Sequence, residues 1–122
     1  MKRPILAIDN IHTSIQNFIA TSRQQLVTEV QAAIAAHPVV VVGMGQNPVV
    51  KKARKLLDAA GMAHHDLSYG NYFSMWRERN ALKMWTGWPT FPMVFVRGTL
   101  VGGCNDVEKL IVSGELKTML AS

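Results

Sequence analysis

The sequence WPTFPMVFVRGTLVGGC, residues 88–104, predicts a β-hairpin near the C-terminal end of the chain. Its first strand is the apolar run Met93–Val96, and its second strand is Thr99–Val101. Arg97-Gly98 between them is short enough for a tight turn, which makes the two strands antiparallel. Gly102-Gly103 then ends the sheet, because paired glycines favour irregular structure.

The residues upstream of this hairpin predict a buried strand that leads into a helix. Val39–Val42 is an uninterrupted β-branched run, which indicates a central strand covered on both faces. After a short loop, Asn47 is placed to cap a helix whose first residue is Pro48. Gly61 marks the end of that helix, since glycine commonly follows the last helical residue.

The remaining elements complete an α/β pattern. Met62–Leu67 is predicted to be a second strand, and residues 71–85 are predicted to be mostly helical. Beyond the hairpin, Asn105 or Asp106 opens another helix, and a final turn over 114–120 closes the chain. A strand–helix–strand unit implies a parallel pair with a right-handed crossover, to which the hairpin adds antiparallel strands. We therefore predict an α/β fold with a four-stranded mixed sheet flanked by helices on both faces.

Residues 1–21 form an arm that precedes this pattern. Its apolar residues recur at the spacing of one face of a short helix: Ile11, Ile15, Phe18 and Ile19. This extra N-terminal helix either covers the core or forms an interface with a second copy or another protein. The main domain is predicted to span residues 22–122, beginning with a helix that Ser22 caps and His37-Pro38 ends.

The composition describes a globular chain with a modest positive charge. Of the 122 residues 48% are hydrophobic, and 13 Lys and Arg against 8 Asp and Glu leave a net charge of +5. The basic cluster over 51–55 has no interleaved aromatic residues, so we do not expect a nucleic-acid partner. No apolar run is long enough for a membrane span or a signal peptide. We expect no membrane association and a cytoplasmic location.

The chain has a single cysteine, Cys104. One thiol excludes an internal disulfide, a Cys-x-x-Cys pair and a cysteine-rich zinc site within one chain. The neighbouring His64 and His65 point to opposite faces of a strand, so they do not grip one ion together. We therefore expect no metal site.

The chain resembles the glutaredoxin family, and most of all its monothiol branch. The resemblance rests on Trp88-Pro89-Thr90-Phe91-Pro92, Val94–Gly98 and Val101–Cys104, which follow in the family's order and spacing. Further family positions are occupied by Arg79, Lys83 and the ending Gly114-Glu115-Leu116. The match covers about residues 23–122. It implies a thioredoxin fold, which agrees with the predicted order of elements.

The resemblance fails at the nucleophilic cysteine. The family carries this residue at the start of the helix after the first strand, as Cys-Pro-Tyr-Cys or Cys-Gly-Phe-Ser. Aligning that helix on Lys52–Leu57 places Asn47 and Val50 at the two cysteine positions. A helix N-terminus stabilises a thiolate, the species that attacks disulfides and ligates iron. Because asparagine cannot form a thiolate, we expect Asn47 to accept hydrogen bonds from the first helical N–H groups instead.

The resemblance also implies where glutathione would lie. The candidate glutathione-binding residues are Arg79, Thr90, Phe91, Pro92, Gly103, Cys104 and Asn105. A cis peptide bond before Pro92 and the N–H groups of the last helix are the expected binding devices. Arg79 is either a donor to the glycyl carboxylate or a surface residue. Met44 replaces a family lysine, Met93 a glutamine and Asn105 an acid. Glutathione binding is therefore expected to be weak at most.

Three functions remain open at this point. The first is a glutaredoxin-like binding module without the family's reaction and without a required cofactor, whose ligand is glutathione or a protein and which forms a homodimer through its N-terminal helix. The second is a glutathione-linked redox protein that uses Cys104, whose place at a helix N-terminus would lower its pKa. Against this second function stands a buried, inert Cys104. The third is the iron–sulfur role of monothiol relatives, which Asn47 disfavours.

Overall fold

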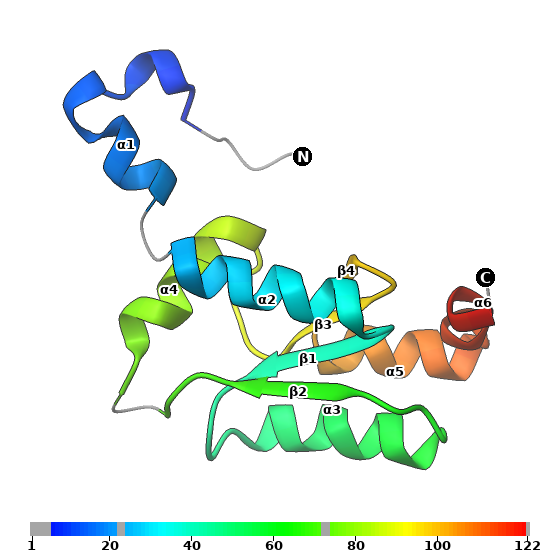
Figure 1. Ribbon diagram of the computed structural model, residues 1–122. Coiled ribbons are helices and arrows are strands. Elements are labelled where there is room, and N and C mark those ends of the chain that lie inside the picture. Colours follow the sequence, from blue (N-terminus) through cyan, green and yellow to red (C-terminus); the bar gives the residue numbers. More distant parts are fainter. Residues whose placement is uncertain (1–5, 22–23, 72–73, 122) are drawn as a thin grey trace.

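The computed structural model describes residues 6–21, 24–71 and 74–121, and its elements follow the predicted order (Figure 1). The strands are β1 Val39–Gly43, β2 His65–Ser68, β3 Met93–Val96 and β4 Thr99–Gly102. After a 3₁₀ turn at Ile8–Asn10, the helices are α1 Thr13–Thr21, α2 Gln24–Ala36, α3 Pro48–Ala59, α4 Trp76–Thr86, α5 Cys104–Ser113 and α6 Glu115–Ala121. The predicted cap Ser22 lies outside the described residues.

The four strands form one mixed sheet in the order β2-β1-β3-β4, with β1 and β3 in the interior and β2 and β4 at the edges. β1 pairs in parallel with β2, where Val40 lies opposite His65. It pairs antiparallel with β3, where Val40 lies opposite Phe95. β3 and β4 form the predicted hairpin, with a register shift between Val94 and Phe95. The prediction of an α/β fold with a four-stranded mixed sheet is confirmed.

The central strand is buried on both faces, as its continuous apolar run predicts. Val40 and Val42 belong to a core shared with α2 and α4, whereas Val39 and Val41 belong to a second core shared with α3, α5 and α6. Figure 1 shows α2 on one side of the sheet and α3 on the other. Among the described residues, the fully buried helical side chains are Val30, Val50, Ala53, Leu57, Leu82, Val107 and Leu116.

Two boundaries differ from the prediction for local reasons. β2 begins at His65 rather than Met62, because the Met62 N–H donates to the Leu57 carbonyl at 3.0 Å and still belongs to the end of α3. α4 begins only at Trp76, because Met75 has a φ of 56° and a right-handed helix cannot contain a left-handed residue.

The N-terminal arm stands away from the layers of the main domain in Figure 1. Ile15 on α1 is 49% exposed, and the side chains of Phe18 and Ile19 lie outside the described ones. Among the helices of the described residues, none is both long and apolar enough to cross a membrane.

Candidate functional site

Asn47 caps α3 at the place where the resemblance puts a nucleophilic cysteine. Its backbone is extended, with φ −92° and ψ 115°, and Pro48 follows as the first helical residue. The side-chain Oδ1 accepts hydrogen bonds from the N–H groups of Val49 at 2.9 Å and Val50 at 3.1 Å. The predicted cap is confirmed, and the amide oxygen satisfies two donors that an attacking thiolate would otherwise use.

Val50, at the second family cysteine position, is part of the core. Its side chain is fully buried and packs against Gly43 at the end of β1. A Cβ built on Gly43 would lie 2.5 Å from Val50 Cγ1, so the two residues fit each other only because Gly43 has no side chain. Val50 therefore presents no group to a ligand.

The loop between β1 and α3 is tied to the chain that follows β2. The Tyr69 N–H donates to the Gly43 carbonyl at 2.9 Å, and the Gly45 N–H donates to the Gly70 carbonyl at 2.6 Å. Met44, which stands where the family has a lysine, is buried. These contacts hold the loop, and the side chain at position 44 is a buried methionine without a charge.

Arg79 donates hydrogen bonds to backbone carbonyls of the segment that precedes α4. Its side chain is buried, with 8% exposure, and Nη1 donates to the carbonyl oxygens of Tyr69, at 3.0 Å, and Ser74. The surface alternative for Arg79 is therefore wrong. The other alternative is that Arg79 donates to the glycyl carboxylate of glutathione. Its Nη1 is already used by two carbonyl oxygens, and leaving either of them buried without a donor would cost free energy.

The segment before β3 has the cis peptide bond that the resemblance implies, between Phe91 and Pro92. Thr90 is exposed, whereas Phe91 and Pro92 are buried. The ammonium Nζ of Lys83, on α4, lies 5.7 Å from the centre of the Phe91 ring. Lys83 is thus a cation beside this segment that the candidate residues omitted. The sequence signal that could have pointed to Lys83 is its spacing of four residues from Arg79, which puts both on one face of the helix.

The start of α5 lies against the same segment. A Cβ built on Gly103 would lie 3.5 Å from the Pro92 carbonyl oxygen and 3.8 Å from Trp88 Nε1. Gly103 is the N-cap of α5, and its N–H donates to Asp106 Oδ2 at 3.0 Å. The helix therefore begins at Cys104, earlier than the predicted Asn105 or Asp106, because Asp106 is the third helical residue and closes a capping interaction onto Gly103.

Cys104 is a buried thiol at the start of α5. Its side chain is buried, with 4% exposure, and it has no disulfide partner in the chain. Burial raises the pKa of the thiol; the charge of Lys52 opposes this effect, while that of Glu108 adds to it. The expectation that the helix N-terminus lowers this pKa is therefore wrong, because desolvation outweighs the favourable charge of Lys52.

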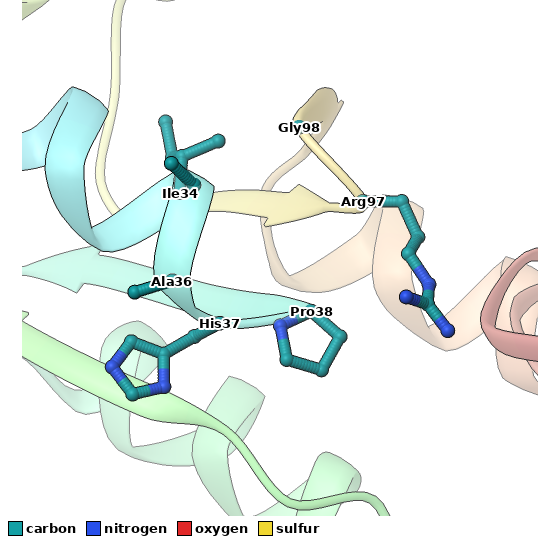
Figure 2. A pocket seen from close by; sticks show the side chains of 7 residues that line it. Ile34, Ala36, His37, Pro38, Arg97 and Gly98 are labelled. Carbon is teal, nitrogen blue, oxygen red and sulfur yellow. The ribbon is translucent and has the colours of Figure 1, made fainter.

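A separate pocket of about 400 Å³ lies at the opposite end of β1, between the end of α2 and the β3–β4 turn (Figure 2). Figure 2 shows His37 and Arg97 pointing away from each other around Pro38. His37 stacks on His65 with ring centres 4.1 Å apart, and Arg97 Nη2 donates to the Leu120 carbonyl at 2.7 Å. Because its polar groups do not converge, this pocket lacks the arrangement of a chemical site.

The structure thus brings together only part of the candidate set. Pro92 lies beside Gly103, and Asn105 is exposed on the first turn of α5. The Arg79 side chain instead donates to the backbone carbonyl of Tyr69. Over residues 6–21, 24–71 and 74–121, no group of three or more His, Cys, Asp or Glu is arranged to hold a metal ion.

The sequence is similar to that of named proteins, although no protein-family model matches it. A glutaredoxin-like protein of Dictyostelium discoideum is 48% identical over 103 residues, which cover 84% of this chain and 84% of that protein. A probable monothiol glutaredoxin 2 of Rickettsia typhi is 50% identical over 42 residues, which cover 34% of this chain and 38% of that protein.

The fold is similar to that of solved glutaredoxins. A buckwheat glutaredoxin, solved as a complex with glutathione, superposes with a TM-score of 0.69 at 26% identity. The superposition covers 80% of this chain and 89% of the buckwheat chain. The likeness therefore extends over most of both molecules.

Proposed function

The chain belongs to the glutaredoxin family, and we propose that it is a member in which the position of the attacking thiol has become structural. On this proposal the protein does not carry out the family's thiol–disulfide exchange. It acts as a binding module whose ligand is an extended thiol peptide such as glutathione, held weakly, or a segment of a partner protein.

The observation that carries the proposal is the hydrogen bonding of Asn47. Thiol exchange needs a thiolate at this helix N-terminus, because the thiolate is the nucleophile. The Asn47 side chain is an uncharged amide whose oxygen is engaged by the Val49 and Val50 N–H groups. The Asn47 side chain therefore has neither the negative charge nor the nucleophilic sulfur that thiol–disulfide exchange requires.

Cys104 does not replace the missing nucleophile. Burial keeps its thiol protonated at neutral pH, since the pKa is raised above its ordinary value. A buried, protonated thiol reacts slowly with disulfides for want of both charge and access. The same facts argue against an iron–sulfur cluster, which is held by accessible thiolates: the residues at positions 47 and 104 do not fit that group.

Several features support retained, weak binding of a thiol peptide. Thr90 is exposed and the bond before Pro92 is cis, and Pro92 lies beside Gly103 at the start of α5, whose N–H groups favour a carboxylate. The buckwheat glutaredoxin binds glutathione on the same fold. Position 44 has no cation, and Nη1 of Arg79 already donates to two carbonyl oxygens, so fewer charge-assisted contacts are left for a ligand and binding is expected to be weak.

Two further points belong to the proposal. The protein works in the cytoplasm, where a lone thiol stays reduced. The exposed apolar residues Leu6 and Ile15 of the N-terminal arm form an interface with a second copy or another protein.

The decisive experiment compares three proteins in a hydroxyethyl-disulfide reductase assay with glutathione. The wild-type chain is expected to remain at the background rate, and Cys104→Ser is expected to behave in the same way. Asn47→Cys is expected to gain activity, because it restores a thiol at a helix N-terminus that favours the thiolate. Wild-type turnover comparable to that of an ordinary glutaredoxin would overturn the proposal, and its loss in Cys104→Ser would assign the activity to Cys104.

A further inference from the structure

His64 lies between two carboxylates on different elements of the fold. Its Nε2 is 2.8 Å from Asp58 Oδ1 on α3, and its Nδ1 is 2.6 Å from Asp66 Oδ1 on β2. The His64 side chain is only 9% exposed, whereas Asp58 is 69% exposed. The carboxylates face opposite edges of the ring, so they do not converge on one point as metal ligands would.

Both contacts are hydrogen bonds only when the ring carries two protons. A neutral imidazole has one N–H donor and one acceptor nitrogen, and an ionised carboxylate can only accept. With a neutral ring, one of the two nitrogens would therefore face a carboxylate oxygen with its lone pair. The doubly protonated ring donates to both carboxylates and carries the opposite charge, which makes both bonds charge-assisted.

The surrounding charges favour this state. Asp66 Oδ1 also lies 3.5 Å from Arg54 Nε, and Arg54 Nη2 donates to Ser68 Oγ at 3.0 Å. Arg54 can balance only one of the two acids, so a protonated His64 balances the other. The next residue, His65, stacks on His37 and has no contact with either carboxylate among those found for the described residues.

We propose that His64 is a pH-operated clasp that fastens the edge strand β2 to α3 when the ring is doubly protonated and releases it when the ring becomes neutral. β2 lies at an edge of the sheet and is joined to the sheet through β1. Its continuation, Tyr69-Gly70, holds the loop ahead of Asn47 through the bonds to Gly43 and Gly45. Release of the clasp therefore loosens the loop that positions the candidate site.

The direction of the pH dependence follows from the contacts. Burial lowers the pKa of His64, but the hydrogen bonds and charges of Asp58 and Asp66 outweigh it and raise the pKa above 6.5. A raised folded-state pKa means that the clasp stabilises fully below the unfolded value of 6.5. That stabilisation is lost as the pH rises through the folded-state pKa.

The first test is a nitrogen-15 NMR titration of the histidine rings in the full chain. His64 is expected to titrate above the ordinary imidazole pKa of about 6.5, with protons on both ring nitrogens at the acid end. Asp58→Asn, which alters an exposed carboxylate and keeps the fold, is expected to shift the His64 titration to lower pH. A His64 ring with one proton at the acid end, or a titration that Asp58→Asn leaves unmoved, would refute the clasp.

The second test follows amide hydrogen exchange at Gly45 and Tyr69 from about pH 5.5 to about pH 8.5, a range that brackets the ordinary imidazole pKa of about 6.5. After correction for the intrinsic exchange rate, protection is expected to fall with rising pH in the wild-type chain and in His12→Gln. It is expected to be independent of pH in His64→Gln. Equal pH dependence in His64→Gln and the wild-type chain would overturn the proposal, whether or not the chain reduces disulfides.

Discussion

The guanidinium group of Arg79 donates a hydrogen bond to the backbone carbonyl of Tyr69, with 3.0 Å between Nη1 and the oxygen. Tyr69 in turn donates its N–H to the Gly43 carbonyl at the end of β1. One buried cation on α4 thus helps to hold the loop that leads to Asn47. Arg79 thus contributes to the scaffold around Asn47.

Arg79→Leu is expected to destabilise the fold by about 1–3 kcal/mol, because it leaves the Tyr69 and Ser74 carbonyls without their donor. The free energy of unfolding in urea measures the loss. Arg77→Leu is the control, since Arg77 is exposed on the same helix and its loss should stay within about 0.5 kcal/mol. Equal stability of the two variants would show that Arg79 does not support the loop.

Asn47→Ala is expected to cost about 1 kcal/mol of unfolding free energy, because the Val49 and Val50 N–H groups lose their acceptor. Asn47→Asp should retain stability at neutral pH, since a carboxylate accepts the same bonds and is favoured at a helix N-terminus. Urea unfolding of both variants checks this pair. An Asn47→Ala variant as stable as the wild-type chain would show that the Asn47 cap does not stabilise α3.

Lys83→Met is expected to weaken glutathione binding about tenfold, which corresponds to about 1.4 kcal/mol. The reason is that Lys83 Nζ lies 5.7 Å from the centre of the ring of Phe91, the residue that precedes the cis bond to Pro92. Amide shifts of Thr90–Met93 during a glutathione titration measure the affinity. Lys55→Met, on the exposed surface of α3, should bind as the wild-type chain does; a matching loss in both variants would point to overall charge rather than to Lys83.

Cys104 is expected to react with an aromatic disulfide reagent at least about tenfold more slowly in the folded chain than in urea, because it is buried and its thiol pKa is raised. Since the raised pKa keeps the thiol protonated, the folded-state rate should climb only at pH above the ordinary thiol range. Val112→Cys in a Cys104→Ser background is the control, because Val112 on α5 is 82% exposed. A native Cys104 that reacts as fast as this control would restore it as a redox candidate.

Much of the fold could be predicted because its signals are local. The run Val39–Val42, the turn Arg97-Gly98 and the cap Asn47 each depend on residues within a few positions of one another, and each lies where it was predicted. The start of α4 was not predictable in the same way. Nothing in the residue types announces that Met75 adopts a left-handed conformation, because that conformation is unfavourable for an isolated residue and is imposed by its surroundings.

Some properties of the candidate site likewise follow from the sequence alone, whereas others depend on the tertiary structure. The absence of a thiol at position 47 and the single cysteine follow from the order of residues alone, because no packing can turn an asparagine into a nucleophile. Whether Cys104 is a thiolate or an inert thiol, and whether Arg79 faces a ligand or a carbonyl, depended on the tertiary structure. The pKa of a thiol and the partner of a guanidinium are set by burial and by groups from other elements. The pKa of His64, which lies between Asp58 of α3 and Asp66 of β2, is raised by groups of the same kind, since the packed fold brings both carboxylates to its ring.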